Sequence, residues 1–182
     1  MSLAPKKIEI LETLLMYDKP LRSKKIAEEM NNDFPEIQMH LVGLTKKGYT
    51  RSPEKAYYTI TEEGRKAVGF PEVDKQKAKA IMDCVPQNRA FHFYVEINKP
   101  LNVHAYSLQE FCNDLSKVDI CSVEFHFTRG DFEAWFSSIG DLELAKKMEL
   151  LKRKKMAGEE LRDRLREIVE ARCNALAKQL NQ

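Results

Sequence analysis

Two stretches of the chain contain the side chains that could do chemistry. The first, between residues 36 and 55, mixes amide, acidic and basic side chains. The second, between residues 92 and 135, contains three histidines, one arginine and the only tryptophan. The first set is typical of a surface that binds a polyanion, and the second set is typical of a site for a small molecule or a metal ion.

The first stretch has the residue types that contact DNA. Gln38 can pair with adenine in the major groove, and Glu36 can accept a hydrogen bond from cytosine. Lysine and arginine side chains bind phosphates and make the affinity depend on salt. The candidate DNA-contacting residues are Glu36, Gln38, Met39, Val42, Gly43, Lys46, Lys47, Arg51 and Lys55. Met39 and Gly43 favour protein contact instead, because a surface without a cation is poor at binding DNA.

In the second stretch, His92 and His126 lie in segments that we predict to be strands, on the faces opposite Phe93 and Phe125. If the two strands are neighbours, the histidines converge with Glu124, and three protein ligands plus water form a catalytic zinc pattern. The tight H-x-x-x-H or C-x-x-C spacing of such sites does not occur in the sequence. A polar face of a sheet explains the same residues, so we expect no metal.

Arg129 is a candidate anion-binding residue, and Trp135 a candidate stacking platform. A structural interpretation competes with this one: Gly130 would form a tight turn, Asp131 would cap a helix, and the aromatic side chains would lie in the core. The candidate ligand-binding residues are His92, Glu124, His126, Arg129 and Trp135.

The sequence contains no nucleophile–base motif, no glycine-rich phosphate loop and no dinucleotide fingerprint. We therefore predict no catalytic residues, no cofactor and no enzymatic activity. No apolar run approaches the roughly 20 residues of a membrane span. The four cysteines are scattered, which is typical of the reducing cytoplasm. The predicted location is cytoplasmic, with no membrane partner.

Local signals over residues 21–64, which include the first stretch, predict a helix-turn-helix followed by a hairpin. Ser23 is the expected cap of one helix, and Asp33 with Glu36 forms a capping box for the next, over residues 33–47. The apolar residues Ile37, Leu41 and Leu44 share one face of that second helix. Residues 49–51 and 56–60 predict a hairpin with a charged tip at 52–55, after which Thr61 caps a further helix.

The second half of the chain predicts three strands, at 90–97, 101–106 and 120–128, with helices between and after them. Ser107 and Glu110 form a capping box. The last helix, 159–180, carries a long apolar stripe. Its members are Leu161, Leu165, Ile168 or Val169, Cys173, Leu176 and Leu180. This stripe either covers the sheet or pairs with a second copy, and we expect it to hold a homodimer.

The order of elements in the first seventy residues resembles the winged helix-turn-helix domains of archaeal and bacterial transcription regulators. The matching segments are 21–30, 37–48 and 58–64. Many members of that class carry an arginine where this chain has Met39. The segments 107–111 and 122–135 resemble a small domain family of archaea whose function is unassigned. That second resemblance implies a domain and no activity.

The sequence therefore predicts an α+β protein. Residues 1–70 form a winged helix-turn-helix domain, 71–89 a connecting helix and linker, and 90–182 an α+β domain with a small sheet and a long C-terminal helix. The predicted function is a homodimeric transcription regulator that binds double-stranded DNA, with a second domain for effector sensing or oligomerisation. The alternative is an adaptor whose winged helix binds protein, and the third interpretation is a small-molecule or metal-binding enzyme domain.

Overall fold

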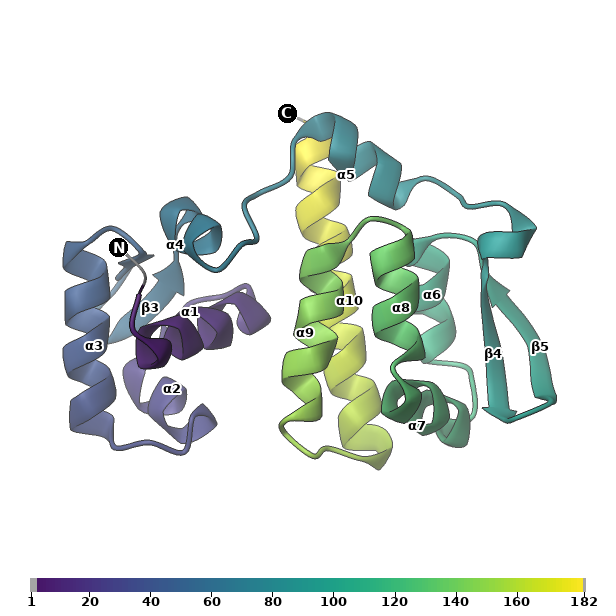
Figure 1. The fold of residues 1–182 in the computed structure, drawn as a ribbon, viewed down its shortest axis with the longest axis horizontal. Coiled ribbons are helices and arrows are strands. Elements are labelled where there is room, and N and C mark those ends of the chain that lie inside the picture. Colours follow the sequence, from purple (N-terminus) through teal and green to yellow (C-terminus); the bar gives the residue numbers. More distant parts are fainter. Residues whose placement is uncertain (1–2, 182) are drawn as a thin grey trace. The chain divides into compact units, whose positions relative to one another are not determined.

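The computed structural model describes residues 3–181 and is a mixed α+β structure, 61% helical and 12% strand. This confirms the predicted α+β class, with small sheets and a long C-terminal helix (Figure 1). The chain divides into two compact units, residues 1–72 and 73–182. The helix that follows the first unit belongs to the second.

The first unit has three helices, then a hairpin and a short fourth helix. Its elements are α1 (Pro5–Tyr17), β1 (Leu21–Arg22), α2 (Ser23–Glu29), α3 (Phe34–Lys46), β2 (Thr50–Arg51), β3 (Tyr57–Ile60) and α4 (Glu62–Ala67). The strands form an antiparallel sheet in the order β1-β3-β2. The hairpin was predicted. The pairing of β1 with β3, which sets Leu21 opposite Tyr58, was not.

One apolar core holds the first unit together. The predicted stripe of α3, formed by Ile37, Leu41 and Leu44, is fully buried. The remaining core residues are Ile10, Leu11, Leu14, Leu21, Ile26, Ala27, Met30 and Tyr58. Removing these side chains from water is the main contribution to the stability of the first unit. Because the buried side chains of α3 lie on one face of the helix, that face packs against the core and the opposite face points outward.

Local backbone signals explain where the helices of this unit end and begin. Gly48 follows α3 with a φ of +80°, the left-handed conformation that glycine adopts at helix ends. The Thr61 hydroxyl accepts a hydrogen bond from Gly64 N at 3.1 Å, as predicted for a cap. Asp33 is the N-cap of α3, as predicted, but its side chain makes no capping hydrogen bond. The predicted cap Ser23 is wrong, because Arg22 is the N-cap of α2 and Ser23 is its first helical residue.

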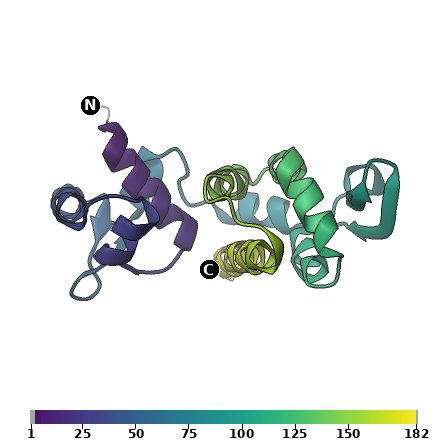
Figure 2. The same ribbon diagram turned by 90° about the horizontal axis from the view of Figure 1, so that it is seen from below.

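The second unit combines one hairpin with a group of helices. Its elements are α5 (Lys75–Met82), the 3-10 turn Gln87–Arg89, β4 (Phe91–Glu96), β5 (Lys99–Ala105), α6 (Leu108–Leu115), α7 (Ile120–Arg129), α8 (Asp131–Ser138), α9 (Leu142–Lys152) and α10 (Gly158–Leu180). The hairpin lies at one edge of the unit, where it contacts α6 and α7 (Figures 1 and 2). An aromatic cluster that includes Phe91, Phe93, Phe111 and Phe132 packs beneath it.

The prediction of a strand at 120–128 is wrong, because these residues form helix α7. Val123, Phe125 and Phe127 alternate along the sequence, but Val123 and Phe127 are also one helical turn apart. Val123, His126 and Phe127 are buried on one helical face. Asp119 supports the helix, since its Oδ1 accepts a hydrogen bond from Cys121 N at 2.7 Å. The sheet of this unit therefore has two strands among the described residues.

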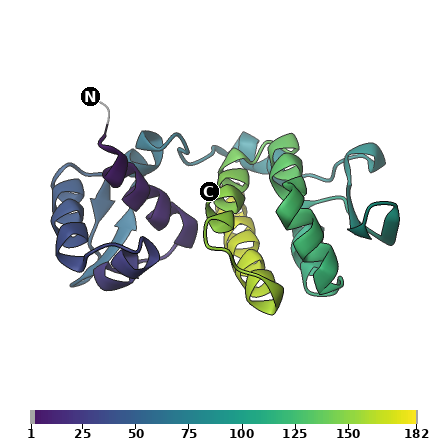
Figure 3. The ribbon, with the colours of Figure 1, turned by 60° about the horizontal axis from the view of Figure 1, so that its bottom comes forward.

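The apolar stripe of α10 is buried within the second unit. Leu165 and Val169 are 0% exposed, and Leu161 and Leu176 are 1% exposed. The helix packs against α5, α6, α7 and α9 (Figure 3). The stripe thus has no need of a second copy, and the expectation that it holds a homodimer loses its physical reason.

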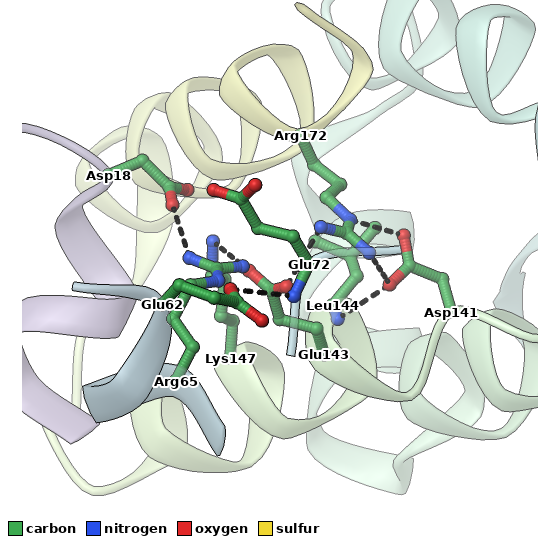
Figure 4. A network of polar contacts seen from close by, with 9 residues as sticks. All are labelled: Asp18, Glu62, Arg65, Glu72, Asp141, Glu143, Leu144, Lys147 and Arg172. Carbon is green, nitrogen blue, oxygen red and sulfur yellow. Dashed lines mark hydrogen bonds and ion pairs between the residues drawn. The ribbon is translucent and has the colours of Figure 1, made fainter. Parts of the chain in front are cut away.

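Buried charges also join α9 to α10 (Figure 4). The Arg172 guanidinium donates to both oxygens of Asp141, at 2.8 and 2.9 Å, and to Glu143 at 2.8 Å. Glu143 also pairs with Lys147 at 3.0 Å. Asp141 in addition caps α9, accepting from Leu144 N at 3.1 Å. Each buried charge therefore has an opposite partner, which offsets its loss of hydration.

Candidate functional site

The outer face of α3 is the first candidate surface, and its exposed part is largely apolar. Met39 is 64% exposed, Phe34 46% and Val42 40%. Glu36 is exposed, and its Oε1 atom lies 3.7 Å from Nε2 of His40. A side chain at Gly43 would meet no atom within 4 Å, so the helix is open to solvent there.

Gln38 differs from the other predicted DNA-contacting residues. Its amide nitrogen donates to the Tyr58 hydroxyl at 2.9 Å, and the side chain is half-buried. This bond joins α3 to β3, and so it occupies the amide that we expected to read adenine.

Four exposed cations follow the outer face of α3 along the chain. Lys46 is the last residue of α3 and Lys47 follows it, Arg51 lies in β2, and Lys55 lies in the 52–56 turn. None of the four has an acidic partner among the residues that the structure describes. Unpaired surface cations are available for phosphate contacts.

Arg22 is a further exposed cation, next to strand β3 of the hairpin, that the sequence did not indicate. Its Nε donates to the Tyr57 hydroxyl at 2.8 Å, and its guanidinium lies 5.2 Å from the centre of that ring. The two residues face each other in the β1–β3 pair. Because this pairing joins segments 35 residues apart, no local pattern could have revealed it.

The second candidate site is a pocket of about 400 Å³ in the second unit. It is formed by β4, the turn after it, α7 and the start of α8. Its lining residues are Phe91, His92, Tyr94, Ile97, Asn98, Phe125, His126, Arg129 and Asp131.

His126 is buried beside this pocket, and both of its ring nitrogens are occupied. Nε2 accepts a hydrogen bond from Tyr94 N at 2.8 Å, and Nδ1 lies 2.7 Å from Asp131 Oδ2. Burial lowers the pKa of His126, and its hydrogen bond to Asp131 opposes this effect. The imidazole is therefore neutral at pH 7, with its proton on Nδ1 and donated to Asp131.

This arrangement restricts what His126 can do. A general base needs a free ring nitrogen within reach of the proton that it abstracts. Here Nε2 accepts from the backbone of β4 instead, so the Asp131–His126 pair joins three elements and is not poised for proton transfer. The pocket lining includes no serine, threonine or cysteine as a nucleophile.

Arg129 is the cation of the pocket. Its Nε donates to Asp131 Oδ2 at 3.2 Å, and its guanidinium lies 5.0 Å from the centre of the Phe125 ring. The two terminal nitrogens have no partner among the described residues. They present two parallel donors, the geometry that matches a carboxylate.

The structure brings together three of the five predicted ligand-binding residues, His92, His126 and Arg129. Glu124 lies elsewhere, because its carboxylate accepts from Gly158 N at 2.7 Å, at the start of α10. Trp135 is 7% exposed, and its indole N–H donates to Arg89 O at 2.9 Å. Trp135 is therefore a core residue and not a stacking platform.

The expected convergence of His92 and His126 on neighbouring strands does not occur. His126 lies on a helix, and His92 faces His104 across the hairpin with ring centres 4.4 Å apart. Within residues 3–181, no group of three histidine, cysteine or acidic side chains is placed to hold a metal ion.

Asp131 is a site residue whose role the sequence suggested wrongly. We expected it to cap a helix, but Gly130 is the N-cap and Asp131 is the first residue of α8. Its carboxylate instead contacts His126 and Arg129. The only sign of this cluster in the sequence was that His126, Arg129 and Asp131 lie close together along the chain. No sequence pattern indicated that Tyr94, Ile97 and Asn98 would line the same pocket.

Comparisons with known proteins identify one family. Residues 15–170, which extend over both units, match the model of a family of unknown function, DUF5752. No curated protein and no solved structure matches the chain. Among the described helices, none is both long enough and apolar enough to cross a membrane. Since the match covers most of its length, the chain belongs to the family DUF5752.

Proposed function

We propose that the first unit is a winged helix-turn-helix domain and that the protein is a DNA-binding transcription regulator. The observation that carries this proposal is the set of four unpaired cations, Lys46, Lys47, Arg51 and Lys55, that follows the exposed face of α3. In winged helices the second helix of the motif lies in the major groove. Here that helix is α3, and the 52–56 turn is the wing.

The charges of the protein make this a local interaction. The formal net charge of the chain is only +2, so the whole molecule attracts DNA weakly. Affinity then depends on the few phosphate contacts of Lys46, Lys47, Arg51 and Lys55. Two half-sites bound by a dimer increase affinity and set the register. A homodimer therefore remains part of the proposal, through a surface other than the buried face of α10.

In this proposal the second unit senses a small effector through its pocket, and the protein acts in the cytoplasm. The four cysteines are free thiols, which is typical of a reducing compartment.

The exposed apolar side chains favour a second candidate function, an adaptor that binds protein through α3. Phe34, Met39 and Val42 are each at least 40% exposed on one short helix. Apolar side chains at the centre of a surface are typical of protein interfaces, whereas DNA interfaces are more polar and more positive.

The test is a titration of a fluorescent duplex of mixed sequence with the full chain, at salt concentrations from low to moderate. Each phosphate contact adds about 0.9 to the slope of log affinity against log salt. The double variant Arg51→Ala and Lys55→Ala should therefore reduce the slope by about 1.8 and weaken binding to all sequences similarly.

The matched control is the double variant Lys75→Ala and Lys79→Ala. It removes the same charge from exposed positions of α5, outside this surface, and should leave the slope unchanged. An equal effect of both double variants would mean that only net charge matters. If the wild-type chain does not bind the duplex at low salt, the DNA proposal fails and the adaptor remains.

A further inference from the structure

The size of the pocket limits its ligand to a small molecule. Its volume is about 400 Å³, near the lower end of the range for small-molecule sites. The walls come from the hairpin, α7 and α8, so the pocket is preformed by packed elements of one unit.

The two charged groups of the pocket lie side by side and are only partly satisfied by each other. Arg129 Nε and Asp131 Oδ2 form the single bond between them, at 3.2 Å. The terminal nitrogens of Arg129 and the Oδ1 atom of Asp131 have no partner among the described residues. The pocket thus offers a pair of donors next to a carboxylate acceptor.

These charges select against a simple ion. A ligand with only a carboxylate is attracted by Arg129 but repelled by Asp131. A ligand with only an ammonium group is attracted by Asp131 but repelled by Arg129. A ligand that carries both charged groups on one carbon atom satisfies both residues. A zwitterion is therefore complementary to the pocket, and a single charge is not.

Besides His92, Asn98 and His126, the rest of the lining consists of aromatic and aliphatic side chains. Phe91, Tyr94 and Phe125 contribute rings, and Ile97 is 69% exposed at the turn of the hairpin. An apolar group of a ligand that covers Ile97 would remove the exposed surface of this side chain from water, which favours binding. Stacking of Arg129 on Phe125 also holds the guanidinium in place before a ligand arrives.

We propose that the pocket binds an apolar α-amino acid. Its carboxylate is held by the terminal nitrogens of Arg129, its ammonium group by Asp131 Oδ1, and its side chain lies against the rings and Ile97. His126 positions Asp131 and does not touch the ligand. The proposal rests on the second unit alone and holds whether or not the first unit binds DNA.

The test is isothermal titration calorimetry of the full chain, without DNA, with three probes that share one ring. L-Phenylalanine carries both charges, 3-phenylpropanoate only the carboxylate, and 2-phenylethylamine only the ammonium group. We expect L-phenylalanine to bind about tenfold or more tightly than either analogue, because each analogue leaves one charged group of the pocket unpaired.

Variants identify the residues involved. Arg129→Gln and Ile97→Asp should each weaken binding of L-phenylalanine about tenfold or more. Arg166→Gln and Leu142→Asp are the matched controls, since they change a half-exposed arginine paired with an aspartate and an exposed leucine outside the pocket. Both controls should bind like the wild type. Circular dichroism of each variant should match that of the wild type, which checks that the variant is folded.

Asp131→Asn tests the ammonium contact separately. The asparagine oxygen can still accept the hydrogen bond from His126, so a folded variant is expected to lose preference for L-phenylalanine over 3-phenylpropanoate. The proposal is overturned if the wild type does not bind L-phenylalanine at millimolar concentration. Equal affinity for the three probes, or unchanged affinity of Arg129→Gln, would also overturn it.

Discussion

At the scale of residues, His126 shows how a titratable group acquires a structural role. Its ring accepts from the backbone of β4 and donates to the first residue of α8. The centres of five aromatic rings lie between 4.9 and 6.2 Å from the centre of its ring, including those of Phe91 and Phe132. A neutral imidazole suits this environment, because a charged ring would lose its hydration there.

We predict that the second unit loses stability in mild acid through His126. Burial lowers the pKa of His126 below its ordinary value of 6.5, so the unfolded chain binds a proton at a pH where the folded chain does not. The contribution is complete above pH 6.5 and is lost as the pH falls through the lowered pKa. Thermal unfolding followed by the fluorescence of Trp135 should show this decline.

Substitution identifies the responsible group. His126→Gln removes the titration, so its unfolding temperature should depend less on pH over the same interval, although the variant is less stable overall. His40→Gln, in the first unit, should leave the pH dependence of the Trp135 signal unchanged. An identical pH dependence in wild type and His126→Gln would refute the assignment.

At the scale of elements, the faces of the helices explain both the core and the open surfaces. The helix α10 buries its apolar stripe from Leu161 to Leu176 inside the second unit, whereas α3 leaves Met39 and Val42 in water. The stripe of α10 is therefore a core feature, and the outer face of α3 is the surface available to a partner.

We predict that Leu165→Glu unfolds the second unit and does not yield a folded monomer. Leu165 is 0% exposed, so the new carboxylate would be buried without a partner. The cost should exceed about 3 kcal/mol, from lost packing and the desolvated charge together. Circular dichroism and size measurement check this outcome.

Asn174→Glu is the control for this substitution, because it places the same side chain at an exposed position of α10. It should remain folded. Folded, monomeric Leu165→Glu protein beside a dimeric wild type would instead show that α10 forms an interface between copies.

At the scale of the whole molecule, the division at residues 72 and 73 separates two cores. The first consists of α1 to α3 and the short sheet, and the second of the aromatic cluster and the helices that surround it. The family match, residues 15–170, includes residues of both units.

We predict that fragments 1–72 and 73–182 each fold alone, since each unit has its own core. Both fragments should unfold cooperatively by circular dichroism. The transition of 73–182 should also appear in Trp135 fluorescence, while 1–72 contains no tryptophan. Loss of cooperative unfolding in either fragment would mean that the two cores depend on each other.

The sequence by itself determined the features whose signals are local. The cap Thr61, the glycine after α3, the spacing of Ile37, Leu41 and Leu44, and the strand at 91–96 each depend on residues a few positions apart. Their energies arise within one turn of helix or one hairpin, so a short window of sequence contains the information.

Only the tertiary structure decided α7 and the pocket. The residues 120–129 have one pattern for a strand and another for a helix, and the choice follows from which pattern buries its apolar side chains against the rest of the unit. The bond from Tyr94 to His126 spans 32 positions, and it sets the hairpin beside Arg129 and Asp131. Such contacts depend on how separate elements pack, which no local pattern contains.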